Sequence, residues 1–262
     1  MSENEEKGSL AHQSISLAEL GINLVSRNFS KNLAKNNLSK AGCTRITNAW
    51  QKGTIVDQKT GVVWVRQDKL ASILCTDTKI ARFIFGGADT KDKETRMIEE
   101  DGELKSIECL SVAHVSKELT KLILTPSKMT QRARGQFSYD HLTAILNSPE
   151  IGEIIAIHLE YVNSKQDYLK KARIKRFNLT ADELTGELFH TSSQRSHFSH
   201  IRGKRTCVRL AIDIHNGLVV NDETHGIITK AGVEDEHELL EICKRYSWDI
   251  SWYRPYVQRF KD

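Results

Sequence analysis

The stretch that most constrains the fold of this chain is residues 196–229, SHFSHIRGKRTCVRLAIDIHNGLVVNDETHGIIT. Residues 197–201 favour a short strand that leads into a basic loop, and residues 218–220 favour a second strand entered through an Asn-Gly pair. Asn221 and Asp222 are residue types typical of a helix N-cap, so a helix is expected to begin there. The stretch therefore predicts a ββα unit.

Such a unit would bring three polar side chains together. His200 lies at the end of the first strand, Asn216 precedes the second, and His225 lies in the first turns of the helix. Imidazole has a pKa suited to taking a proton from water near neutral pH. A histidine at a helix start can also hold a divalent ion, and basic side chains nearby can bind phosphate. These residue types could therefore take a proton from water and hold a divalent ion beside a bound phosphate group.

The same residues and spacings resemble the HNH motif of the ββα-metal endonucleases, especially the form found in phage and mobile-element proteins. His200 and Asn216 are sixteen positions apart, and Asn216 and His225 are nine apart. The flanking letters SHI, DIHNGLVV and ETH agree with the motif as well. The resemblance covers about 35 of the 262 residues.

The resemblance implies a role for each matching residue. His200 corresponds to the general base that activates the attacking water, and Asn216 to the residue that pins the hairpin. His225 corresponds to a metal ligand, with Mg²⁺ or Mn²⁺ as the expected ion and Zn²⁺ as a further candidate. The family usually has Asp or His where this chain has Ser199, the expected second metal position. It often has another ligand where this chain has Thr229, and hydroxyls are weak ligands beside carboxylate or imidazole.

Related nucleases nevertheless use one protein ligand and complete the metal shell with water and phosphate. Mg²⁺ keeps most of its waters, so such a site is chemically sufficient. His197 and Asp213 are further side chains that could approach the site.

Two basic segments are candidates for nucleic-acid contact. The loop after the first strand and the basic helix over residues 164–176 can both lie along phosphates. The helix can equally be a connector between domains. The candidate contacts are Arg202, Lys204, Arg205, Lys171, Arg173 and Arg176.

The N-terminal part shows mixed patterns. Apolar spacing over residues 15–38 is roughly helical, and residues 54–65 read as a hairpin with a turn at Gly61. Residues 67–85 hold two short helical patterns separated near Cys75 to Asp77, which is the outline either of a helix-turn-helix or of two adjacent core helices. Residues 86–103 read as a polar, charged loop.

The expected class is α+β, with a mixed N-terminal region and a C-terminal HNH-like module. The chain is 39% hydrophobic and 27% charged, which excludes collagen-like, disulfide-scaffold and wholly disordered classes. The expected divisions are a disordered lead over 1–15, an α+β domain with candidate DNA recognition over 16–162, a basic helical connector over 163–190 and the HNH-like domain over 191–262.

The expected setting is a reduced cytoplasmic one without a membrane partner. No apolar run approaches the roughly 20 residues of a membrane helix, the acidic start carries no secretory pattern, and the five cysteines form no CxxC pair. The expected function is metal-dependent cleavage of DNA. The expected substrate is double-stranded DNA, and the chain could act as a homodimer. The alternative is a regulator that has kept the fold and DNA binding but lost cleavage.

Overall fold

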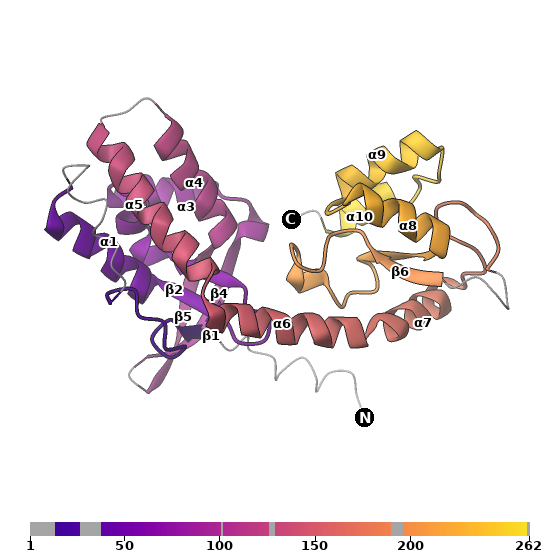
Figure 1. Ribbon diagram of the computed structural model, residues 1–262, viewed down its shortest axis with the longest axis horizontal. Coiled ribbons are helices and arrows are strands. Elements are labelled where there is room, and N and C mark those ends of the chain that lie inside the picture. The colour runs from indigo at the N-terminus through magenta and orange to yellow at the C-terminus, as the bar shows by residue number, and fades with distance from the viewer. Residues whose placement is uncertain (1–13, 27–37, 101, 126–128, 190–195, 261–262) are drawn as a thin grey trace. The chain divides into compact units, whose positions relative to one another are not determined.

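The computed structural model describes residues 14–26, 38–100, 102–125, 129–189 and 196–260 (Figure 1). The fold is mixed α+β, as expected. Two compact units divide the chain near residue 155, inside the continuous helix α6 (Pro149–Ser164). The expected disordered lead over 1–15 and the first residues of the HNH-like domain, 191–195, fall largely outside the described residues.

The first unit contains a five-stranded antiparallel sheet with the order β1-β2-β3-β5-β4. The predicted hairpin is confirmed, because β2 and β3 flank a turn in which Gly61 has a positive φ of 72° that favours glycine. The strands are β1 (Ser14–Ser16), β2 (Thr54–Asp57), β3 (Val63–Arg66), β4 (Lys93–Glu100) and β5 (Glu103–Ser111).

Helices pack against this sheet around one apolar core. Trp50 is fully buried and its indole Nε1 donates to Ser138 Oγ at 2.8 Å, which satisfies its polar end. α4 and α5 pack side by side (Figure 1), where a side chain at Gly135 would crowd Leu122. The helices are α1 (Lys40–Gly53), α2 (Leu70–Ile73), α3 (Thr78–Gly87), α4 (Val112–Leu124) and α5 (Met129–Leu146).

The prediction of a helix over residues 15–38 is wrong for the residues that the structure describes. Residues 14–26 form β1 followed by turns, and residues 27–37 lie outside the described chain. Leu17, Ile22 and Leu24 are fully buried in the core. Their spacing therefore reflects a loop that packs inward rather than the period of a helix.

The polar loop expected over residues 86–103 is also wrong, because α3 extends to Gly87 and β4 forms over Lys93–Glu100. Arg96 is buried in the middle of that strand and donates to Asp57 at 2.5 Å and to Glu94 at 2.8 Å. Its guanidinium also lies 5.0 Å from the Trp64 ring centroid. Pairing with β5 and a buried ion pair stabilise a strand that local composition does not favour.

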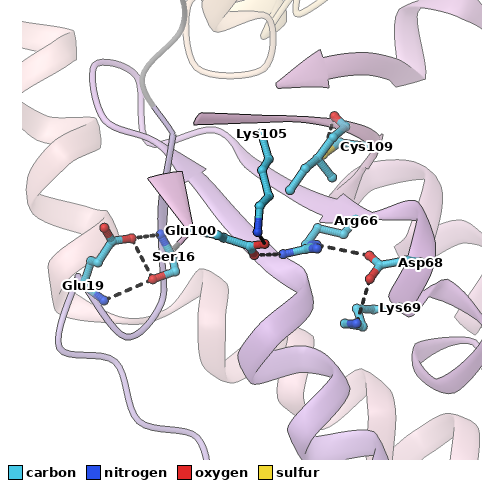
Figure 2. Close-up of polar contacts among 9 residues, drawn as sticks. Ser16, Glu19, Arg66, Asp68, Lys69, Glu100, Lys105 and Cys109 are labelled. Atoms are coloured by element: carbon cyan, nitrogen blue, oxygen red, sulfur yellow. Dashed lines mark hydrogen bonds and ion pairs between the residues drawn. The ribbon is translucent and has the colours of Figure 1, made fainter. Parts of the chain in front are cut away.

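An ionic network joins the end of β3 to the neighbouring segments (Figure 2). Arg66 donates to Asp68 at 3.1 Å and also pairs with Glu100 of β4. Lys69 pairs with Asp68 at 2.6 Å. The 3-10 turn η3 (Gln67–Lys69), which leads into α2, is thereby attached to the β4–β5 hairpin.

The second unit contains the predicted ββα arrangement. A two-stranded antiparallel sheet of β6 (Ser196–His200) and β7 (Gly217–Asn221) leads directly into α8 (Asp222–Ala231). Asn221 is the N-cap residue, but its side chain makes no capping hydrogen bond. α9 (Glu236–Tyr246) and α10 (Tyr253–Arg259) close the core, with Tyr256 buried among apolar residues.

The basic helix α7 (Gln166–Phe177) belongs to this unit and is not a free connector. Leu169 on α7 packs with Phe198 of β6 and Val219 of β7, and all three are buried. Helix α7 has few apolar residues, so its sequence does not indicate a buried face. The β6–β7 surface that covers this face is brought to it only by the tertiary fold. In the ranges the structure describes, no helix has the length and apolar character needed to cross a bilayer.

Candidate active site

The tight packing of the β6–β7 hairpin accounts for its Asn-Gly pair. His200 lies opposite Gly217 in the antiparallel register. A side chain at position 217 would clash with the ring of Phe198, so glycine lets this ring pack against the second strand. The hairpin thereby holds His200 at the end of β6.

Asn216 is the polar centre of the unit and is fully buried. Its Oδ1 accepts from the Arg202 backbone N–H at 3.0 Å and from the Tyr256 hydroxyl at 2.8 Å. Its Nδ2 donates to the carbonyls of Arg202 at 3.0 Å and Leu210 at 3.1 Å. The amide thus joins the loop between the two strands to α10 through four hydrogen bonds.

His200 has a defined tautomer, because a carbonyl oxygen can only accept a hydrogen bond. Its Nε2 lies 2.8 Å from the Ala211 carbonyl and must donate to it, so Nδ1 carries the lone pair of the neutral ring. Nδ1 has no hydrogen-bond partner within the described chain. Burial lowers the pKa of His200, which keeps the imidazole neutral and able to accept a proton.

His225, on the first turns of α8, stacks on a second histidine. The rings of His197 and His225 are 4.6 Å apart and nearly parallel, at 13°. His197 Nε2 also forms a hydrogen bond with the carboxylate of Asp222. Burial, followed by the neighbouring His197, lowers the pKa of His225. A neutral imidazole is the form that binds a metal ion.

These side chains line one cleft of about 620 Å³. His200, His225, Ser199 and Thr229 all contribute to its wall, so the structure brings the predicted base and the predicted metal positions together. His197 and Ser199 lie two positions apart on β6 and so share one side of the strand.

The donor set of the cleft fits an ion that needs few protein ligands. Across the described residues, no three His, Cys, Asp or Glu side chains converge as a metal site. His225 offers one imidazole and His197 a second beside it. Ser199 and Thr229 add only hydroxyls. Mg²⁺ and Mn²⁺ can complete such a shell with water and phosphate oxygens.

Among the described residues, three cations and two carboxylates, those of Asp167 and Glu234, line the cleft. Lys204 and Arg205 come from the loop after β6, as predicted, and Lys170 comes from α7. Lys204 Nζ donates to Asn163 at 2.5 Å, and Lys170 Nζ donates to the Ser196 carbonyl at 3.1 Å. Lys170 also pairs with the cleft carboxylate of Asp167 at 3.2 Å. The positive charge that would attract a phosphate group beside the histidines therefore comes mainly from Lys204 and Arg205.

Two of the arginines predicted to contact nucleic acid form ion pairs within the protein instead. Arg202 forms a two-pronged pair with Glu236, both bonds at 2.7 Å, and does not line the cleft. Arg173 is buried, pairs with Glu183 through two bonds of 2.7 Å and donates to the Ile214 carbonyl at 2.8 Å. Both guanidiniums hold the unit together, so we assign them no contact with phosphate.

Lys171 and Arg176 are exposed on α7 and also lie outside this cleft. Asp213 is likewise not part of the cleft wall, and its carboxylate accepts from the backbone N–H of His215.

Two further side chains line the cleft: His197, which the sequence offers only as a residue that could approach the site, and Lys170, to which it assigns no role. The alternation of a strand gives a signal for His197, because it shares a side with the expected ligand position 199. Lys170 offers no such signal, since only the packing of α7 against β6 brings it to the site.

No protein-family model, no curated protein and no solved structure matches this chain. Function is therefore inferred from the geometry of the cleft and from the motif in the sequence.

Proposed function

We propose that the chain is a divalent-metal-dependent endonuclease that hydrolyses phosphodiester bonds of DNA. The observation that carries this proposal is the hydrogen bond from His200 Nε2 to the Ala211 carbonyl, at 2.8 Å. It leaves Nδ1 as a proton acceptor in a cleft that also contains His225 and three cations.

His200 acts as the general base. Its Nδ1 takes a proton from a water molecule while the water oxygen attacks phosphorus and the bond from phosphorus to the leaving ester oxygen breaks. The leaving oxygen takes its proton from solvent. The Ala211 carbonyl stabilises the protonated ring by accepting from Nε2–H, so the ring keeps its orientation while it holds the proton.

His225 would hold the metal ion, with His197 as an adjacent imidazole. A bound Mg²⁺ or Mn²⁺ supplies positive charge that stabilises the leaving oxygen and the phosphate. Asp222 accepts a hydrogen bond from His197 and so fixes the ring beside His225.

Lys204, Arg205 and Lys170 would bind the phosphate groups of the substrate. They approach the cleft from two separate elements, the loop after β6 and helix α7. Several cations along one groove suit a phosphate backbone that runs along it.

The test is nicking of supercoiled plasmid DNA by the full chain with Mg²⁺ or Mn²⁺. We expect His200→Gln to lower the cleavage rate at least about 100-fold, since loss of a general base costs that much or more. The matched control is His237→Gln, an exposed histidine of the same unit that does not line the cleft. It should cleave like the wild type. Equal loss in both variants, or unchanged cleavage by His200→Gln, contradicts the assigned base.

The metal site has its own readout. Calorimetric titration with Mn²⁺ alone should give binding that His225→Ala abolishes and His237→Gln preserves. Wild-type binding that survives His225→Ala would contradict the assigned ligand.

A second candidate is a DNA-binding protein that no longer cleaves. Ser199 and Thr229 favour it, because they occupy both positions where the resembling family often has stronger ligands. Metal-independent DNA binding with no nicking in either metal ion would select this alternative and exclude the nuclease.

A further inference from the structure

The first unit contains two short helices joined by a tight turn. The turn η3 (Gln67–Lys69) continues into α2, and α3 follows after residues 74–77. Cys75 has a positive φ of 54°, the position that usually requires glycine, and Asp77 caps α3 by accepting from the Ile80 N–H at 2.8 Å. The order and the turn are those of a helix-turn-helix.

α3 has one buried and one open face. Ala81 and Phe85 pack into the core, with 4% and 9% of their surface exposed. Lys79, Arg82 and Phe83 lie on the open face, and Phe83 is 81% exposed. An aromatic ring in that position contributes nothing to the core of its own unit and is available for contact with another molecule.

The open face carries positive charge. Residues 78–87 contain no acidic side chain, and Lys79 and Arg82 have no ion-pair partner in the part of the chain that the structure describes. The one carboxylate at the helix start, that of Asp77, is engaged as the cap. Lys93 reaches the other end of the helix, with its Nζ 3.4 Å from the Gly86 carbonyl.

Further cations lie beside the turn. Burial raises the pKa of Cys75 to about 12, and Arg134 and Arg45 are close enough to act against that shift. Arg45 is exposed on α1, a helix that contains no acidic residue. Arg45 of α1 and Arg134 of α5 are therefore further cations of this unit that act electrostatically on the turn.

The C-terminal end of α3 is open to close approach. Gly86 and Gly87 are both exposed, and a side chain at either would meet no other atom of the described chain. Because neither position projects a side chain, a polyanion strand can come near the helix backbone there.

We propose that α3 is a DNA-recognition helix that docks in the major groove of double-stranded DNA. Ten residues make a helix of about 15 Å, and the major groove, about 12 Å wide, admits an α-helix. Lys79 and Arg82 bind phosphates or guanine edges, and Phe83 contacts an apolar base edge such as the thymine methyl group. The choice of DNA rests on the proposed function, but this site belongs to the first unit and uses none of the residues assigned to cleavage.

The test is fluorescence anisotropy of a labelled 30-base-pair duplex with the full chain in EDTA, so that cleavage cannot contribute. Lys79→Gln with Arg82→Gln should raise Kd at least about tenfold and lower the slope of log K against log salt by up to about two. The charge-matched control is Lys59→Gln with Lys117→Gln, two exposed lysines elsewhere in the same unit. Phe83→Ala should raise Kd at least about threefold and leave the salt slope unchanged, because it removes no charge.

The proposal is overturned if the α3 pair and the control pair bind DNA equally. It is also overturned if Phe83→Ala leaves DNA binding intact but abolishes self-association measured by light scattering, since α3 is then an interface between copies of the chain. If DNA binding depends on α3 but no nicking is seen, the proposed nuclease activity is excluded and the proposed recognition helix is supported. If the chain nicks DNA but its DNA binding does not depend on α3, the nuclease is supported and the recognition helix is excluded.

Discussion

The second unit contains two groups of polar side chains that differ in their partners. One group is engaged by the protein itself, and the other keeps polar atoms open to a ligand. Asn216, Arg202 and Arg173 form a buried or half-buried frame, in which each side chain is engaged by several protein partners. In the cleft, His200 keeps Nδ1 without a partner in the described chain, and Arg205 is exposed with no ion pair there.

The comparison separates stability from function. A buried polar atom that loses its partner costs about 1–3 kcal/mol, so the frame tolerates little change. An exposed cation is screened by water and contributes little to folding, which leaves it available for a ligand. Changes in the frame should therefore alter unfolding, and changes in the cleft should alter binding and rate.

Asn216→Ala should have the largest effect on stability. It leaves two carbonyls, one backbone N–H and the Tyr256 hydroxyl without their partner, and we expect the free energy of unfolding to fall by about 3 to 5 kcal/mol. Urea unfolding with segment-resolved hydrogen exchange measures the loss in residues 201–216. Gln258→Ala removes an exposed amide of the same unit and should cost less than about 0.5 kcal/mol. Similar losses in both variants would contradict the central place of Asn216.

Glu236→Gln should have the next largest effect, and this effect should depend on pH. Burial opposes ionisation of Glu236, but the hydrogen bonds from Arg202 outweigh it and hold the pKa of the carboxyl below its usual value of 4.5. The ionised form therefore stabilises the folded state above that value, and the stabilisation is lost as the pH falls through the lower, folded-state pKa. We expect about 2 kcal/mol between wild type and variant at pH 7.

Guanidinium chloride unfolding at pH 7 and at successive acidic pH values measures this difference. The gap between wild type and Glu236→Gln should narrow as the pH falls below about 4.5. A gap that stays constant with pH would show that the ion pair does not carry the stabilisation.

Lys204→Gln with Arg205→Gln should have the smallest effect in free energy and should act on DNA alone. We expect Kd for duplex DNA to rise about tenfold, equivalent to about 1.4 kcal/mol, with unchanged unfolding. The charge-matched control is Lys171→Gln with Arg176→Gln, two exposed cations of α7 outside the cleft. If the control weakens binding as much as the cleft pair, the cleft is not the surface that binds phosphate.

Local signals account for most of what was predicted correctly. The Asn-Gly pair, the capping residue types and the alternation around His200 give the ββα arrangement, because each depends on neighbours in the chain. The hairpin at Gly61 and the α3 cap at Asp77 were predictable for the same reason. β4 was missed because its stability depends on β5 and on the Arg96–Asp57 pair, 39 positions apart in sequence.

The sequence by itself determined the residue types of the candidate site and the local elements that carry His200, Asn216 and His225. Only the tertiary structure decided which cations face the cleft. Arg202 and Lys204 are two positions apart in one basic loop, yet one is paired with Glu236 and the other borders the histidines. The physical reason is that a charged side chain pairs with the groups that the fold brings within reach. Glu236 and Lys170 come from helices distant in the chain, so the local sequence does not reveal these neighbours.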